Sequence, residues 1–158
     1  RWCEDLAFYK KIMNPKNVIG DSRARSTRLT CSVLLEKDGK LLLVQEGKET
    51  KAYGKWNQPA GHLDEGETPI DCAKREALEE SGYKVKILSL IAVMYYREQT
   101  QNEQPTHIHF CFTARPIGKQ SLKLADDVLQ AKWFTKSEIK RFPKKDFRGL
   151  DTITRLKL

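Results

Sequence analysis

The sequence predicts a single α/β domain built from mixed strands and one prominent helix. The length of 158 residues allows one domain and little more, at roughly 100–200 residues per domain. Hydrophobic residues make up 39% of the chain, enough for one core, and no internal repeat or linker divides it. Runs rich in leucine and β-branched residues lie on both sides of one stretch with helical spacing. Together these observations favour one α/β unit.

The first predicted element is a β-hairpin. Residues 29–35 and 40–45 are apolar runs, and Lys37-Asp38-Gly39 joins them. Asp-Gly between two apolar runs favours a tight hairpin turn. The polar residues 46–55 that follow are expected to form a loop.

The central helix has clear ends. Thr68 is a favoured N-cap residue, Pro69 suits the first helical position, and Gly82 suits the position after the last turn. The stretch between them carries the apolar residues Ile70, Ala73, Ala77 and Leu78. This pattern predicts a helix over residues 69–81.

Three strands and two short helices complete the prediction. A long, bent strand is joined to a second strand by a polar stretch, and a final strand follows. After the final strand, Thr135 and Glu138 form a capping-box pattern that starts a short helix. The strands are expected at residues 84–96, 106–114 and 132–135, and the last helix at residues 146–156. Residues 29–158 form the main domain, and residues 1–28 an N-terminal extension with a short amphipathic helix near residues 6–13.

The net charge narrows the class of ligand. Lys and Arg total 29 against 21 Asp and Glu, a formal net charge of +8, which attracts anions such as nucleotides, phosphorylated metabolites or RNA. Nine of the Lys and Arg residues lie between residues 132 and 157. They are not interleaved with aromatic residues at the spacing of a base-stacking surface, so the pattern leaves nucleic-acid binding open without supporting it.

The cysteine pattern indicates in which cellular compartment the protein is expected. The four cysteines, Cys3, Cys31, Cys72 and Cys111, are scattered without a C-x-x-C pair. This argues against a disulfide scaffold or a zinc site and favours reduced thiols in a cytoplasmic protein. No run approaches the roughly 18 apolar residues that a membrane helix needs, so no membrane partner is expected.

Three glutamates on the predicted helix suggest chemistry. Glu76, Glu79 and Glu80 are spaced i, i+3 and i+4, which places their carboxylates on one face. Each like-charged pair costs roughly 0.2–0.5 kcal/mol on an exposed helix, so the cluster needs a counter-ion. Hard carboxylate oxygens suit Mg²⁺ or Mn²⁺, and such ions assist phosphoryl chemistry. A solvated, Glu-rich helix is the alternative that this pattern alone leaves open.

The spacing around these glutamates resembles a known family. The segment Gly61-x5-Glu67-x7-Arg75-Glu76-Ala77-x-Glu79-Glu80-x-Gly82-Tyr83 is similar to the Nudix hydrolase signature G-x5-E-x7-R-E-U-x-E-E-x-G-U, where U is aliphatic. All seven fixed identities are present, a chance of about one in a hundred million per starting position at average residue usage. The departures, Ala77 and Tyr83, fall on packing positions. The resemblance implies a Nudix-type α/β/α sandwich with a central mixed β-sheet.

The resemblance also implies catalytic and metal-binding roles. The three glutamates match the family's metal ligands, together with the backbone carbonyl of Ala60, and the implied cofactor is Mg²⁺, with Mn²⁺ as the alternative. Arg75 matches an arginine that holds the carboxylates in place, and Glu67 matches a residue that supports it. The general base is either a signature glutamate, Glu76 or Glu80, or a later acid. The later candidates are Asp126 and Asp127, with Glu98 and Glu103 as weaker ones.

Residues outside the glutamate cluster are candidates for binding substrate. Gly61 and His62 lie beside the expected metal, and Asp126 and Asp127 precede the last strand. Trp56 could stack on a base, although a single Trp in a strand is more often a core residue. His107 and His109 alternate along one strand, where they would either meet the substrate or be satisfied internally.

The expected substrate is a small phosphorylated molecule. Residues 56–62 resemble NudJ-like phosphatases, and residues 112–116 and 126–134 resemble phosphatases of oxidised guanine nucleoside diphosphates. Both indicate release of a terminal phosphate from nucleoside di- or triphosphates or from a small organic diphosphate. The alternatives are a pyrophosphohydrolase of ADP-ribose, dinucleotides or capped RNA, and a non-catalytic module that binds nucleotides or RNA. A homodimer is compatible with the resemblance.

Overall fold

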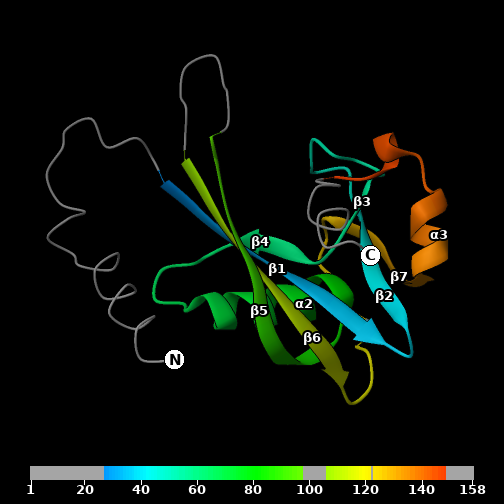
Figure 1. Cartoon of the computed structure of the whole chain (residues 1–158), viewed down its shortest axis with the longest axis horizontal. Coiled ribbons are helices and arrows are strands. Elements are labelled where there is room, and N and C mark those ends of the chain that lie inside the picture. Colours follow the sequence, from blue (N-terminus) through cyan, green and yellow to red (C-terminus); the bar gives the residue numbers. More distant parts are fainter. Residues whose placement is uncertain (1–26, 98–105, 122, 149–158) are drawn as a thin grey trace, which may run out of the picture.

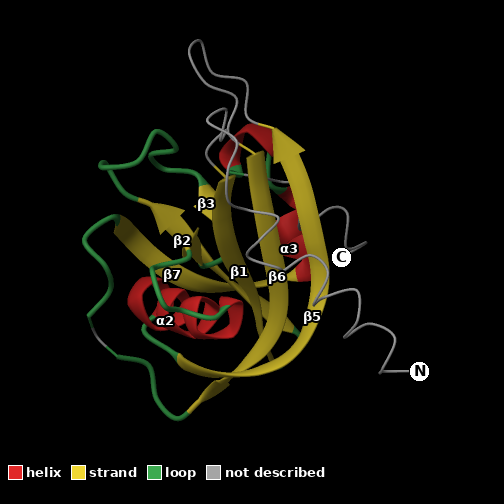
Figure 2. Cartoon of the chain, turned by 90° about the vertical axis from the view of Figure 1, so that its left-hand side faces the viewer, coloured by secondary structure: helices red, strands yellow, loops and turns green. Residues whose placement is uncertain are grey.

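The computed structural model describes residues 27–97, 106–121 and 123–148. The strands are β1 (Thr27–Lys37), β2 (Lys40–Glu46), β3 (Trp56–Asn57), β4 (Ala60–His62), β5 (Lys84–Arg97), β6 (Thr106–Ile117) and β7 (Val128–Thr135), and the helices are α2 (Pro69–Ser81), α3 (Lys136–Arg141) and the 3₁₀ helix η2 (Lys144–Asp146). The described strands form one mixed sheet along the path β3-β2-β1-β6-β5, with β4 attached to β1 and β7 attached to β2 (Figure 1). Figure 2 shows α2 beside this sheet.

The sheet is organised around β1. This strand pairs parallel with β6 over residues 27–35, antiparallel with β4 over residues 30–32, and antiparallel with β2 at its end. At the turn into β2, Asp38 and Gly39 have φ angles of 50° and 71°. Positive φ at both central residues is what a type I′ hairpin turn requires, so the predicted hairpin is confirmed.

The predicted helix ends are confirmed in α2. The Thr68 side chain accepts a hydrogen bond from the Asp71 amide, and Pro69 occupies the first turn. Gly82 ends the helix with φ 74° and donates its N–H to the Leu78 carbonyl. A Cβ at Gly82 would also lie 2.6 Å from the Ser121 carbonyl oxygen, so this position has no room for a side chain.

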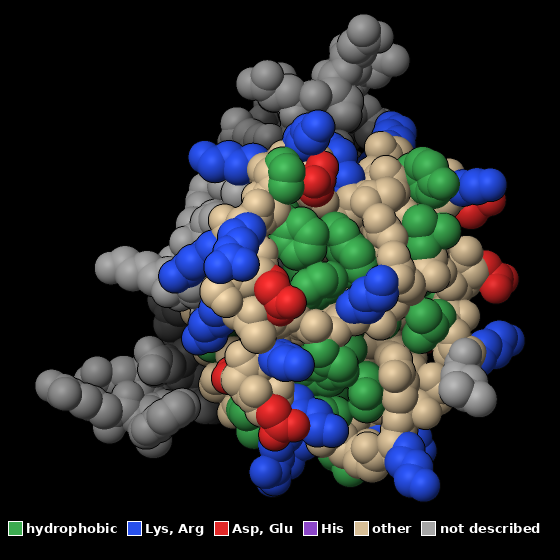
Figure 3. All heavy atoms as spheres, turned by 90° about the vertical axis from the view of Figure 1, so that its right-hand side faces the viewer, with side chains coloured by type: hydrophobic (Ala, Val, Ile, Leu, Met, Phe, Trp, Pro, Cys, Tyr) green, Lys and Arg blue, Asp and Glu red, His purple; other side chains and the backbone are tan. Residues whose placement is uncertain are grey.

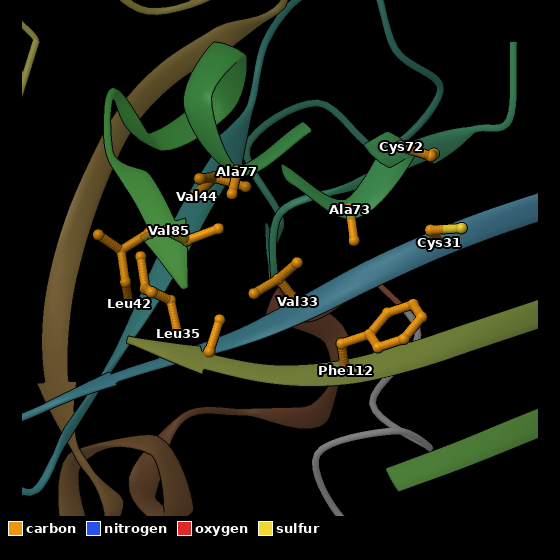
Figure 4. Close-up of a cluster of buried hydrophobic side chains, with 11 residues drawn as sticks. Cys31, Val33, Leu35, Leu42, Val44, Cys72, Ala73, Ala77, Val85 and Phe112 are labelled. Carbon is orange, nitrogen blue, oxygen red and sulfur yellow. The ribbon is translucent and has the colours of Figure 1, made fainter. Parts of the chain in front are cut away.

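Alternation along β1 divides the interior into two clusters. The cluster between β1 and α2 (Figure 4) consists of Cys31, Val33, Leu35, Leu42, Val44, Cys72, Ala73, Ala77, Val85, Phe112 and Ala114. The cluster on the other face of β1 consists of Leu34, Leu41, Leu43, Trp56, Cys111, Ile139 and Phe147. Because Ile139 belongs to α3, the two helices cover opposite faces of the sheet. This confirms the α/β/α arrangement.

Three parts of the chain differ from the prediction. β3 and β4 lie in a stretch with Gly and Pro that has no apolar alternation, and they form by pairing with β2 and β1. β7 begins at Val128 rather than at residue 132, because its pairing with β2 continues to Glu46. The helix predicted over residues 146–156 does not begin as expected, since η2 ends at Asp146 and Phe147 is extended.

Some predictions fall outside the described residues. They are the helix near residues 6–13, the part of the last helix from residue 149 onward, and the weaker base candidates Glu98 and Glu103. No helix in the described ranges combines the length and the apolar composition that a membrane span requires. Cys31, Cys72 and Cys111 are buried free thiols.

Candidate active site

A cavity of about 990 Å³ opens beside α2 and β4. Acidic residues dominate its charged lining: Glu46, Asp64, Glu76, Glu79, Glu80 and Asp127. The Lys and Arg residues that line it are Lys51, Arg75 and Arg148. The cavity therefore has an acidic lining inside a chain whose net charge is +8.

Arg75 ties the separate parts of the signature segment together. Its Nε and Nη2 donate to the two Glu67 carboxylate oxygens at 2.7 and 3.0 Å. Its Nη1 donates to Glu76 at 2.7 Å and to Glu79 at 3.2 Å, and Nη2 also donates to the His62 carbonyl at 2.9 Å. Hydrogen bonding to Arg75 is the main cause that lowers the pKa of Glu67. One guanidinium thus fixes the loop before α2, the end of β4 and two helix carboxylates.

Glu76 is buried against the backbone of Gly61. Burial raises the pKa of the Glu76 carboxyl, and hydrogen bonding to Arg75 opposes that rise. A Cβ at Gly61 would overlap the Glu76 carboxylate. The absence of a side chain at residue 61 therefore lets the helix carboxylate reach the β4 backbone.

Glu80, four residues after Glu76, is half-buried. Its Oε2 accepts a hydrogen bond from the Ala60 amide at 2.8 Å. Burial raises its pKa to about 9, although the Ala60 amide favours the charged form, and the negative charges of Glu76, Glu46 and Asp127 add to the rise. Glu79 is more open, with half of its side chain exposed. A cation in this cluster would relieve the repulsion between the carboxylates.

The donor set fits a hard divalent ion. Carboxylate oxygens and a backbone carbonyl are the groups that Mg²⁺ and Mn²⁺ prefer. Among the described residues, no three Asp, Glu, His or Cys side chains already converge as ligands of one ion. Glu76 faces Arg75, and Glu80 faces the Ala60 amide. Ligation by all three glutamates therefore requires side-chain rotation on α2.

The structure brings some of the other predicted site residues to the cavity and not others. Gly61, His62 and Asp127 line it. The loop that carries Asp127 is held in place because the Asp127 carbonyl accepts from the Gly47 amide at 2.6 Å. Asp126 is exposed and lies outside the described lining. Trp56 is buried, with its ring centroid 4.9 Å from that of Phe134, so the structure places it in the core.

His109 lines the cavity, and both of its ring nitrogens have hydrogen-bond partners within the protein. Its Nδ1 lies 2.7 Å from the Thr30 hydroxyl, and its Nε2 lies 2.7 Å from the Ser32 hydroxyl. Burial, together with the nearby His107, lowers the pKa of His109 to about 4. The imidazole is therefore neutral near pH 7 and offers no positive charge to a phosphate.

Several residues of the cavity carry no sequence signal that marks them as part of a site. Glu46, Asn57 and Arg148 share one part of the lining, and Thr30 and Met94 belong to another. None of them belongs to a recognisable motif. Glu46 has the clearest sequence signal of these residues, because it is an acid at the end of an apolar strand. In the structure its side chain is buried.

Comparison with known proteins identifies the family. The chain matches the family model of the NUDIX domain over residues 26–155. It is 32% identical over 111 residues to the human 8-oxo-dGDP phosphatase NUDT18, a match that covers 68% of this chain and 32% of the relative. It is 44% identical over 54 residues to the phosphatase NudJ of Escherichia coli K12, covering 34% of each. The matched stretches thus span about a third of the length of these curated relatives.

Solved structures agree with this match. A NUDIX hydrolase from Nitrosomonas europaea is 29% identical, with a TM-score of 0.67 over 84% of this chain and 87% of that chain. The MutT protein of Methanosarcina mazei Go1 is 18% identical, with a TM-score of 0.69 over 86% of this chain and 96% of that chain, a likeness that shows the fold alone. The family model matches most of the chain, and the signature segment is folded around one arginine. The chain therefore belongs to the Nudix hydrolase family.

Proposed function

We propose that the chain is a Mg²⁺-dependent phosphohydrolase that releases the terminal phosphate of a nucleoside diphosphate or triphosphate, or of a small organic diphosphate. The observation that carries the proposal is the carboxylate cluster of Glu76, Glu79 and Glu80, organised by Arg75 at the wall of a cavity of about 990 Å³. The names of two relatives, an 8-oxo-dGDP phosphatase and a phosphatase, support this choice of substrate class.

In this proposal the metal is held by Glu76, Glu79, Glu80 and the Ala60 carbonyl, with Mn²⁺ as an alternative to Mg²⁺. A bound divalent ion polarises a phosphoryl oxygen and lowers the pKa of a coordinated water. Arg75 restrains the Glu76 carboxylate at the Gly61 backbone, and ligation of a metal rotates the carboxylate from this position.

Two acids of the cavity are candidates for the general base. Glu80 is half-buried and held by the Ala60 amide, and Asp127 lies on a loop fixed to Gly47. Asp127 faces the cluster from outside the signature segment, and its charge acts on both Glu76 and Glu80. The variants Glu80→Gln and Asp127→Asn distinguish the two candidates. The pH dependence of kcat changes only in the variant that lacks the residue that takes the proton.

The test is phosphate release with Mg²⁺ from a panel of nucleoside di- and triphosphates, 8-oxo-dGDP, ADP-ribose and thiamine diphosphate. We expect turnover of a diphosphate that falls on the order of a thousandfold in Glu80→Gln. Glu36→Gln is the matched control, because Glu36 is an exposed acid outside the cavity lining. Undiminished turnover in Glu80→Gln would contradict the proposal, as would inactivity of a folded, metal-binding wild type on every substrate.

A non-catalytic binding module is less well supported. The chain keeps every glutamate of the signature, which a module without catalysis has no need to retain. On the face shown in Figure 3, the Lys and Arg side chains are spread between hydrophobic side chains rather than gathered into one continuous patch. Salt-dependent binding of RNA near physiological ionic strength, without turnover, would favour the module instead.

A further inference from the structure

Arg148 reaches the cavity from outside the signature segment. It follows η2, and its backbone N–H donates to the Trp56 carbonyl at 2.9 Å. The residue before it, Phe147, is buried and forms an isolated parallel bridge with Trp56. The backbone at residue 148 is therefore fixed to β3, next to the cavity lining.

The side chain of Arg148 is anchored at one end of its guanidinium. Nη1 donates to Glu46 Oε2 at 2.9 Å, and the other Glu46 oxygen accepts from Asn57 Nδ2 at 3.4 Å. The Glu46 side chain is 8% exposed, whereas that of Arg148 is 54% exposed. A buried carboxylate thus holds a guanidinium whose other side is open, and within the described residues Glu46 is its one side-chain partner.

The other cations of the cavity are less suited to hold an anion. Arg75 already donates from all three of its nitrogens to Glu67, Glu76, Glu79 and the His62 carbonyl. Lys51 is an exposed loop residue, and a lysine is a point charge on a flexible stem. A substrate diphosphate that enters a lining of six acids meets strong repulsion unless cations offset it. Among the described residues, Arg148 keeps Nε and Nη2 available for two parallel hydrogen bonds, the geometry in which guanidinium binds phosphate.

We propose that Arg148 binds a phosphate group of the substrate and that Glu46 is the positioning residue that orients it. The inference rests on the proposed function, since it assigns a residue to the diphosphate of the same site. The competing explanation is purely structural: Arg148 only neutralises buried Glu46, whose unpaired charge would be costly.

A double variant separates the two explanations. In Arg148→Gln we expect KM for a nucleoside diphosphate to rise about 10- to 100-fold, the range for loss of a charged hydrogen bond, while kcat changes only a few-fold. In Glu46→Gln the rise is smaller, because the guanidinium keeps its charge but loses its orientation. The double variant Glu46→Gln/Arg148→Gln contains no unpaired charge, so its Tm returns toward that of the wild type while KM stays raised.

The control removes the same charge from the same segment without touching the cavity. Lys145 is exposed in η2, and Lys145→Gln is expected to leave KM unchanged. Recovery of wild-type KM in the double variant would overturn the proposal, because it would show that Arg148 acts only through Glu46. An equal rise of KM in Lys145→Gln would also overturn it, since the effect would then be one of net charge.

Binding measurements keep this inference separate from the proposed function. The probe is the α,β-methylene analogue of GDP, which cannot be hydrolysed between its phosphates, titrated with Mg²⁺ by calorimetry. We expect Kd to rise about 10- to 100-fold in Arg148→Gln and in the double variant. If the wild type binds the probe yet hydrolyses no substrate, the proposed function fails while this result still decides the role of Arg148. Unchanged Kd in Arg148→Gln would refute that role.

Discussion

At the scale of single residues, Gly61 and Gly66 have different reasons for being glycine. Gly61 has ordinary backbone angles, but its Cα faces the Glu76 carboxylate so closely that a Cβ would overlap it. Gly66 has φ 82°, and a Cβ at this residue would meet no atom within 4 Å. One glycine makes room for a functional group, and the other allows a turn.

This contrast predicts opposite effects of the same substitution. In Gly61→Ala the obstructed atoms are the far end of one side chain, so the free energy of unfolding changes by no more than about 1 kcal/mol. The displaced Glu76 carboxylate is expected to lower kcat about a hundredfold. In Gly66→Ala the unfavourable φ lowers stability by about 1 kcal/mol and kcat stays near the wild-type value. Denaturant unfolding and steady-state kinetics on both variants check this, and a stable, fully active Gly61→Ala would contradict it.

At the scale of elements, His109 joins two strands in a way that depends on pH. It lies on β6 and hydrogen-bonds to the hydroxyls of Thr30 and Ser32 on β1, so it adds side-chain contacts to the parallel pairing of these strands. Protonation would make both ring nitrogens donors and place a charge in a partly buried site.

The lowered pKa fixes the sign of the pH dependence. The pKa of His109 falls from the ordinary 6.5 to about 4 in the folded protein, so the unfolded chain binds the proton more tightly. Stability is therefore lost as pH falls from 6.5 toward 4, by up to about 3 kcal/mol from this residue. The wild type is expected to lose more stability over this range than His109→Gln. Parallel curves for wild type and His109→Gln would contradict the assignment.

The elements also show what the sequence can and cannot predict. α2 and the β1–β2 hairpin were predictable because caps, prolines and glycines specify them locally. β3 and β4 were not, because strands of two or three residues have no periodicity and exist only through their partners. At the site, the spacing of the signature marked the α2 carboxylates. Glu46 and Arg148 are 102 residues apart, and no local pattern reports such a pair.

At the scale of the whole molecule, charge is distributed unevenly. The chain carries a net charge of +8, yet the cavity is lined by six acidic residues and three Lys or Arg residues. A basic exterior attracts anionic substrates, and an acidic interior concentrates divalent cations. The repulsion inside the cavity costs stability in the metal-free protein.

Metal binding should therefore stabilise the entire fold. With Mg²⁺ at about a hundred times its Kd, linkage gives about 2.7 kcal/mol, which raises Tm by about 5–10 °C for a domain of this size. Removing the ion with EDTA reverses the rise. Differential scanning calorimetry with and without Mg²⁺ measures it, Glu76→Gln is expected to reduce it, and Glu36→Gln to leave it intact. A Tm that does not respond to Mg²⁺ would argue against the proposed metal site.

The parallel pairing of β1 with β6 also sets an order of events during synthesis. The signature segment is complete once residue 83 has been made, but His109 and Arg148, which also line the cavity, come much later. β1 must wait for a strand 79 residues downstream before its edge is paired. A nascent chain therefore contains its helix carboxylates long before the other residues that line the cavity, so the complete cavity can form only after residue 148 has been made.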